Sequence, residues 1–407
     1  RGNIMREYLK IEFKHFFMNK KNIFIYILLT FAAFFYAYKV APAYDPIEKV
    51  DREEIEARYL TRQEFIESVE LRNFDDVHPV TVQAYYTFSE VNPLDKARLD
   101  TLDSGDLQKY AQVTSEWYFI TNYMTYYNEH ISYNSRYYMK QRELAFDRGF
   151  YNSLEQYARY GAYAKADYEL SINQFEQRTA LQTVERLLNG PLPIILITCV
   201  LLLAIDVVLK DRLHPSVLKG FPLTDWKKLL SKMFVAYIGS LALFLPLLVG
   251  FVVIGMQSGF GHFQLPSPVF TNISEWQQVG SFDMMTLGTF LAQSLALILM
   301  WFLVVIALVI LCSVLFRHEM VNLAVGTLLI FGERFYMSRN VGYFWDIENL
   351  PTSYIQVGKI VSKQHNFFLA SESLDYILGL QLLAISFAIV LIITLLIAKN
   401  KRFMLIK

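Results

Sequence analysis

Long apolar runs alternate with polar segments along this chain, and the longest run sets the class of protein. Between Met284 and Phe316 there is no Asp, Glu, Lys or Arg. About 20 residues of helix cross the hydrocarbon core of a bilayer, so this run is long enough to span it. The sequence therefore predicts an integral membrane protein.

Six segments have the length and hydropathy of transmembrane helices. The fourth is overlong, so we expect it to tilt, kink or project from the bilayer. The fifth is the weakest, because Glu333 and Arg334 interrupt it. The predicted spans are Ile23–Ala41, Pro191–Leu209, Met233–Met256, Leu287–Phe316, Met320–Gly342 and Tyr376–Ala398.

The segment before the first span, Met5–Lys21, mixes aromatic and basic residues. It is typical of an amphipathic helix in the headgroup region, and the alternative is a simple basic flank. The first span lacks a small-x-small cleavage site, so we expect a retained anchor rather than a cleaved signal peptide. We expect the native chain to start at Met5, since Arg1 is not a native first residue.

Basic residues cluster at alternate span ends, which sets the predicted orientation. The stretch Gln257–Asp283 has no Lys or Arg and is expected outside. Both termini are therefore predicted to be cytoplasmic in a multi-pass protein of the plasma membrane. The basic residues on the predicted inner side are Lys20, Lys21, Lys210, Arg212, Lys219, Lys227, Lys228, Lys232, Arg317, Lys399, Lys401, Arg402 and Lys407.

This orientation leaves Tyr44–Leu188 outside the cell as a polar domain. The segment has 25 acidic against 16 basic residues, and few glycines, which favours helix over sheet. Ser104 or Asp106 is predicted to cap a helix running to about Asp147. Asn152 is predicted to cap a second helix, Ser153–Leu188. The part before Asp103 is expected to be less regular.

Tyrosines crowd this predicted hairpin, and two interpretations are open. One is a substrate-facing aromatic surface, because Tyr offers a large contact area with a polar tip. The other is a packed seam between helices, which the recurring spacings of three and four favour, as in Tyr123, Tyr126, Tyr133 and Tyr137.

The predicted fold class is an all-α membrane protein with four parts. These are a cytoplasmic interfacial helix (5–21), the first transmembrane helix (22–43), an extracellular helical domain (44–188), and transmembrane helices two to six (189–407) with a cytoplasmic loop (210–228). A mean hydropathy of +0.27 agrees with this class. The only cysteines, Cys199 and Cys312, lie in apolar runs, so the polar domain has no internal disulfide.

The sequence contains none of the familiar catalytic motifs. There is no Gly-x-x-x-x-Gly-Lys-Ser/Thr phosphate loop, no His-Glu-x-x-His helix and no Gly-x-Ser-x-Gly elbow. His262, His318 and His365 are isolated in sequence, which favours interfacial roles over metal binding. We therefore expect no enzyme, no metal site and no nucleic-acid partner.

Two polar stretches between the predicted spans have distinctive patterns. Asp206–Lys232 is a charged turn broken by Pro215, Gly220 and Pro222, with Pro-Leu-Thr before a Lys-rich helix start. Leu350–Gln364 has the pattern Pro-x-Ser/Thr-Tyr-x-x-Val-Gly before the last span. Both stretches resemble those of the type-2 ABC exporter permeases (the ABC-2 family), the second especially those of Gram-positive members. Most members have only short loops where this chain has its large outer domain.

The resemblance implies that the chain works with a separate ATP-hydrolysing subunit, in two copies, which binds ATP and Mg²⁺. It also implies a second permease, the same or homologous, surrounded by membrane lipid. The ATPase is expected to bind the leader and the loop between the second and third spans. The coupling contacts implied are Asp211, Arg212, His214, Pro215, Lys219, Phe221, Pro222 and Leu223.

Glu333 and Arg334 have two interpretations. Ionisable residues at membrane depth are costly and usually functional, so the pair is a candidate for lining the path or latching an outer gate. Alternatively, a helix end emerges here at the outer interface, with Arg334 snorkelling to the headgroups.

The function predicted first is ATP-driven export of amphipathic or hydrophobic peptides, such as bacteriocins, pheromones or toxins, or of antibiotics. The acidic outer domain suits a cationic or amphipathic cargo. The alternative is a non-transporting receptor or scaffold that senses an extracellular ligand. A sensor usually carries a larger cytoplasmic module, whereas the predicted cytoplasmic segments here are short.

Overall fold

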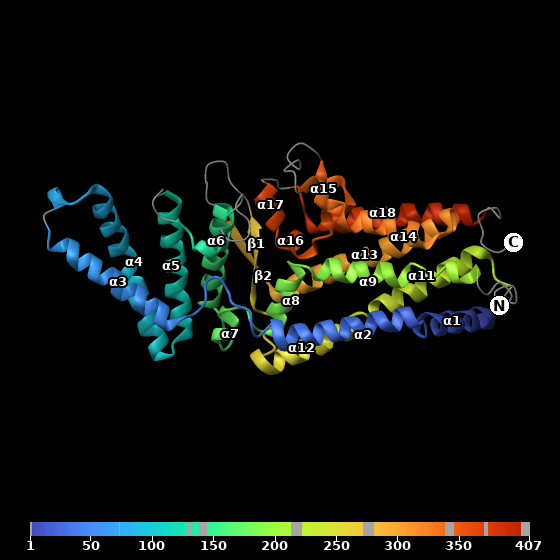
Figure 1. Cartoon of the computed structure of the whole chain (residues 1–407), viewed down its shortest axis with the longest axis horizontal. Helices are drawn as coiled ribbons and strands as arrows, with labels where there is room; N and C mark the ends of the chain where they lie inside the picture. The colour runs from blue at the N-terminus through green and yellow to red at the C-terminus, as the bar shows by residue number, and fades with distance from the viewer. Residues whose placement is uncertain are drawn as a thin grey trace. The chain divides into compact units, whose positions relative to one another are not determined.

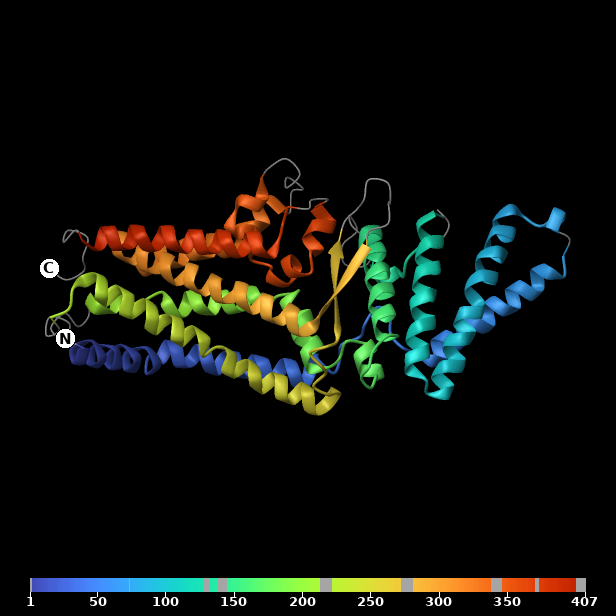
Figure 2. The same ribbon diagram turned by 180° about the vertical axis from the view of Figure 1, so that it is seen from behind.

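The computed structural model is mostly helical and divides into two compact units. The span unit comprises Arg1–Pro42, Thr183–Phe260 and Thr289–Lys407, and the polar unit comprises Ala43–Gln182 and Gly261–Gly288. Figure 1 labels their helices and strands, and Figure 2 gives the opposite view. The structure describes residues 2–72, 74–127, 132–137, 145–212, 222–271, 281–337, 346–369 and 373–399.

The span unit is built of long helices joined by short ones. The short 3₁₀ turns are Leu209–Arg212, Ile347–Asn349 and Pro351–Tyr354. The helices are α1 (Gly2–Phe17), α2 (Lys20–Phe35) with its π-helical continuation Tyr36–Val40, α8 (Ala180–Leu188), α9 (Leu192–Ala204), α11 (Asp225–Leu241), α12 (Phe244–Ser258), α13 (Leu287–Phe316), α14 (Glu319–Phe331), α15 (Glu333–Met337), α16 (Val357–Val361), α17 (Gln364–Leu369) and α18 (Tyr376–Ala398).

Four helical segments in the described part of the chain are long and apolar enough to cross a membrane. They are Lys20–Val40, Asp225–Ser258, Leu287–Phe316 and Tyr376–Ala398. A fifth is added if Ile172–Leu188 and Leu192–Ala204, which meet at a 68° bend, count as one broken span. This pattern indicates a multi-pass membrane protein.

The prediction of six spans exceeds these four or five. The predicted second span, Pro191–Leu209, is α-helical only over the 13 residues of α9. In the predicted fifth span, Met320–Gly342, α14 also has 13 residues and ends at Phe331. Glu333 begins the separate short helix α15, and its carboxylate accepts hydrogen bonds from the Gln356 amide, so the apolar helix does not continue through it. Residues 338–342 lie outside the described residues.

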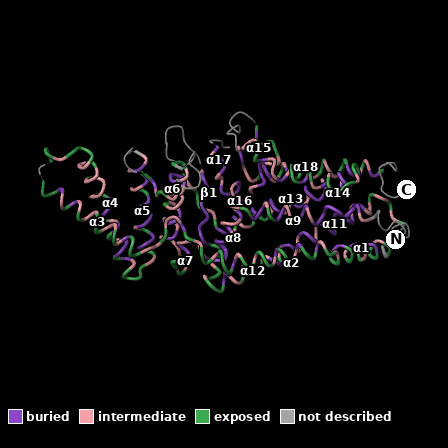
Figure 3. Tube along the Cα trace, in the orientation of Figure 1, coloured by how far each residue is buried: buried purple, intermediate pink, exposed green. Residues whose placement is uncertain are grey.

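Helix α13 forms the core of the span unit. Trp301 and Phe302 on this helix are fully buried. The Trp301 Nε1–H donates to the Tyr354 carbonyl at 3.0 Å, which ties the short helices after α15 to the core. By contrast, Ile385 and Ile389 on α18 are more than half exposed. Figure 3 shows exposed and intermediate colouring along much of α18. Exposed apolar faces of this kind are expected where a helix contacts lipid.

The polar unit is built of helices and one hairpin. Its helices are α3 (Arg52–Glu70), α4 (Pro79–Ser104), α5 (Leu107–Tyr127), α6 (Ala145–Tyr163) and α7 (Ile172–Phe175), with 3₁₀ turns at Phe74–Asp76 and Ser135–Tyr137. Strands β1 (Pro266–Thr271) and β2 (Ser281–Thr286) pair antiparallel, with Pro266 opposite Thr286. The sequence pattern did not predict this hairpin.

Helix boundaries in the polar unit differ from the predicted hairpin. The part expected to be less regular contains α3 and α4. Helix α4 ends at Gly105, whose φ of +74° favours glycine. Helix α5 starts as predicted, because an Asp106 carboxylate oxygen accepts from the Lys109 N–H at 3.0 Å. Asn152 does not cap a helix but lies within α6, where its amide donates to the Tyr137 hydroxyl.

The predicted second helix is also interrupted. Helix α6 ends at Tyr163, and α7 and α8 follow as separate short helices. Most described tyrosines of this region are packed rather than displayed, which favours the seam interpretation, although Tyr123 and Tyr157 are exposed. The buried ones are Tyr110, Tyr118, Tyr133, Tyr137, Tyr151, Tyr160 and Tyr163.

Candidate coupling site

The predicted coupling contacts lie on the connection between α9 and α11. Asp211 and Arg212 end the 3₁₀ turn after α9, and Pro222 and Leu223 precede Thr224, the N-cap of α11. Pro222 is exposed and Leu223 half-buried. His214, Pro215, Lys219 and Phe221 lie outside the described residues.

A buried lysine, Lys232 of α11, contacts both the leader helix α1 and the turn after α9. The Lys232 Nζ lies 2.8 Å from a Glu12 carboxylate oxygen, and the two side chains are 3% and 8% exposed. The same ammonium donates to the Val207 carbonyl at 3.2 Å. Lys232 therefore joins α1, the turn after α9 and α11 at one point.

A second polar cluster joins the start of α2 to the same turn. The Asp206 carboxylate accepts from the Lys21 ammonium at 2.7 Å and from the Asn19 amide at 3.3 Å, and it lies 2.8 Å from the Lys210 ammonium. Burial by itself raises the pKa of Asp206, but Lys21 and Lys210 outweigh burial and hold the pKa below its ordinary value. The Asn19 side chain also caps α2.

Aromatic packing also holds α1 against α11. Phe16 lies over Gly239, where an added Cβ would come within 2.0 Å of the phenyl ring. Phe13 and Phe234 meet edge to face at 6.2 Å. The Tyr26 hydroxyl of α2 donates to the Gly239 carbonyl at 2.8 Å. Glycine at 239 thus permits the close approach of three helices.

Helix α14 is attached to the same turn by Asn322. Its amide donates to the Ile205 carbonyl at 2.8 Å and to the Ser313 hydroxyl at 2.7 Å. The turn after α9 therefore makes polar contacts with α2, α11 and α14, and through Lys232 and Asn322 it is linked to α1 and α13. Hydrogen bonds and ion pairs in a low-dielectric interior give such a junction its stiffness.

Sequence reasoning missed the residues that build this junction. It counted Lys21, Lys210 and Lys232 only as orientation signals, and it assigned no role to Glu12 or Asp206. One signal was available, because Glu12 is one of only two acids, with Glu7, in the basic amphipathic leader. Its partner lies 220 residues away in sequence, so only the fold identifies it.

The structure separates the side chains of Glu333 and Arg334. Glu333 is 2% exposed and accepts from the Gln356 amide at 2.8 and 2.9 Å, one distance to each carboxylate oxygen. The His365 Nε2 lies 3.4 Å from the same carboxylate. Arg334 is exposed, with its guanidinium 5.3 Å from the Phe331 ring centroid. Glu333 thus fastens α15 to the starts of α16 and α17.

The described residues contain no group of three or more His, Cys, Asp or Glu side chains placed to hold a metal ion. His318 caps α14, because its Nδ1 accepts from the Met320 N–H at 3.1 Å. No protein-family model, curated protein sequence or solved structure matches this chain.

Proposed function

We propose that this chain is the permease subunit of an ATP-driven ABC exporter that moves amphipathic or hydrophobic peptides or antibiotics out of the cell or its membrane. In this proposal the polar unit is extracellular and both termini are cytoplasmic. A separate ATPase, in two copies, binds ATP and Mg²⁺, and a second permease completes the path.

The observation that supports this proposal is the junction around Asp206 and Lys232. A motor outside the membrane moves transmembrane helices only if the element that it contacts is held firmly to them. The junction fixes the connection between α9 and α11 to the leader and to four further helices through buried polar contacts.

The test is copurification of an ATPase with the tagged full-length chain from its native membranes in mild detergent. We expect Mg²⁺-dependent ATP hydrolysis to accompany the wild-type chain. Phe221→Asp or Pro222→Asp, in the loop, is expected to remove it while leaving membrane insertion unchanged. Leu71→Asp is the matched control, because Leu71 is 89% exposed on the polar unit.

Two outcomes would count against the proposal. If no ATP hydrolysis above background accompanies the wild-type chain, it is not an ABC permease. If hydrolysis accompanies both loop variants as well as the control, this loop is not the coupling site.

A further inference from the structure

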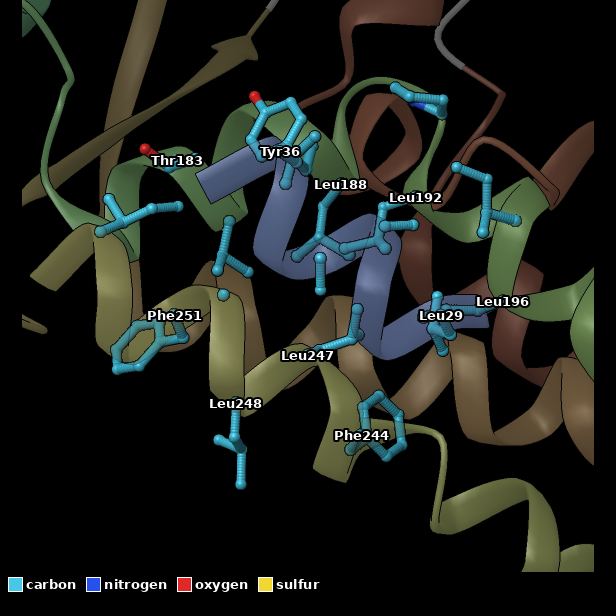
Figure 4. Close-up of a pocket in the computed structure, with 18 of the residues that line it drawn as sticks. Leu29, Tyr36, Thr183, Leu188, Leu192, Leu196, Phe244, Leu247, Leu248 and Phe251 are labelled. Carbon is cyan, nitrogen blue, oxygen red and sulfur yellow. The ribbon is translucent and has the colours of Figure 1, made fainter. Parts of the chain in front are cut away.

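An apolar pocket of about 450 Å³ lies within the span unit, between α2, α8, α9, α12 and α13. Its volume falls within the range of roughly 300–1,000 Å³ found for small-molecule sites. Each helix lines it with a stripe at helical spacing, as α2 does with Leu29, Ala32, Ala33 and Tyr36. Figure 4 shows these stripes converging on one space.

The pocket has an apolar interior and one polar end. Leu29, Leu196 and Phe244 lie toward one end, whereas Tyr36 and Thr183 lie toward the other, as Figure 4 shows. The polar end is where α2 changes from α-helical to π-helical, a local irregularity that is frequent at functional sites. It is also close in sequence to Pro42 and Thr183, where the chain leaves and re-enters the span unit.

The Arg186 side chain lies next to Thr183, one of the two residues at the polar end. The Arg186 guanidinium donates to the Thr183 hydroxyl at 3.1 Å, and Thr183 lines the pocket. An arginine at this position offers charge-assisted hydrogen bonds to a phosphate, for which its planar fork is well matched. The pocket thus has an apolar interior, two hydroxyl-bearing residues at one end and a cation one hydrogen bond beyond Thr183, which is a pattern complementary to a phospholipid.

The mouth of the pocket opens among side chains that face away from the protein. Ile195, Leu248 and Leu295 line it and are 43%, 54% and 42% exposed. In a membrane these side chains contact acyl chains. Water is a poor occupant, because it requires two to four polar partners that the interior does not supply. An empty pocket would forfeit dispersion contacts with every residue that lines it.

We propose that this pocket binds one acyl chain of a membrane phospholipid, with the phosphate beside Arg186. Helices α2 and α12 contact each other at one wall of the pocket, where Gly250 lies against the Ala33 carbonyl. The bound lipid fills the space beside this contact. In this inference the lipid is a bound structural component of the chain and not a transported molecule, so the site does not depend on the export proposal.

The test uses the purified full-length chain in nanodiscs of phosphatidylglycerol and phosphatidylcholine. A trace phospholipid carries a photoreactive diazirine midway along one acyl chain, and mass spectrometry maps the labelled peptides after irradiation. We expect peptides of α8, α9 and α12 to be labelled at least about fivefold more than peptides of α18, whose outward face also contacts lipid.

Two pairs of variants locate the site. Val184→Trp fills the pocket and is expected to lower its labelling about fivefold, whereas Ile389→Trp, on the exposed face of α18, leaves it unchanged. Ala32→Trp is the alternative filling variant if Val184→Trp does not fold. Arg186→Gln is expected to lower labelling about threefold. Arg317→Gln is its control, because Arg317 follows the end of α13, roughly 30 Å along that helix from the pocket residue Ile298.

Two results would overturn the proposal. The first is equal labelling of α12 and α18 that neither filling variant changes, since the lipid contact would then be non-specific. The second is efficient disulfide linkage of two copies through Leu248→Cys in a Cys199→Ala, Cys312→Ala background. That linkage would show that a second copy, rather than a lipid, covers the mouth.

Discussion

Removing Lys232 is expected to detach the leader helix from the span unit. Lys232→Met keeps much of the side-chain volume but removes the ammonium, which leaves the Glu12 carboxylate buried at 8% exposure with no cation 2.8 Å away. Loss of one partner from a buried ion pair costs about 3–5 kcal/mol. The Val207 carbonyl loses its 3.2 Å donor as well. We therefore expect the docked state of α1 to lose at least a hundredfold in population relative to the undocked state.

The assay is hydrogen exchange of the α1 and α11 peptides in the full-length chain, compared with limited trypsin cleavage after Lys10 and Lys14. Both are expected to increase strongly in Lys232→Met. Adding Glu12→Gln removes the stranded charge and is expected to restore part of the protection, so the two substitutions couple by more than about 1 kcal/mol. Glu7→Gln is the control, because its pair with Lys10 is more than half exposed on both sides and the substitution leaves both trypsin sites intact.

Unchanged exchange and cleavage in Lys232→Met would refute this reasoning. Strictly additive single and double variants would also refute it, because a buried pair that contributes to docking must couple.

Two further predictions concern the polar unit. The Asp95 carboxylate is fully buried and pairs with Arg58, Arg62 and Arg98 at 3.1, 2.8 and 3.1 Å. Asp95→Asn leaves these three guanidinium groups without their shared anion. We expect it to destabilise the polar unit by about 3–5 kcal/mol, measured by chemical unfolding of the full chain. Burial raises the pKa of Glu48 despite the nearby Arg58 and Arg98, so ionisation of Glu48 destabilises the folded state. This destabilisation is absent below the pKa of about 4.3 that Glu48 has in the unfolded chain, and it grows as the pH rises above that value. Glu48→Gln is therefore expected to raise the unfolding temperature at pH 8 but not at pH 4, and an equal change at both values would contradict the assignment.

The last two predicted spans differ in how well the sequence predicted them. The apolar runs predicted the last span, Tyr376–Ala398, with the bounds that the structure has, because backbone groups in lipid must be satisfied within the helix itself. The predicted fifth span, Met320–Gly342, stays a prediction beyond α14, which ends at Phe331, close to the interruption that the sequence predicted at Glu333. The partners of Glu333, Gln356 and His365, lie 23 and 32 residues further along the chain, beyond the reach of local periodicity.

The sequence alone determined that this chain is helical, has several membrane-crossing segments and has a separate polar region, because hydropathy and helical period are local properties. The tertiary structure decided which charges are buried together, as with Glu12 and Lys232 or Asp95 and its three arginines. It also decided that α2, α9, α12 and α13 leave an acyl-sized pocket between them. Such features depend on distances between residues far apart in the chain, and only close packing of the folded helices sets those distances.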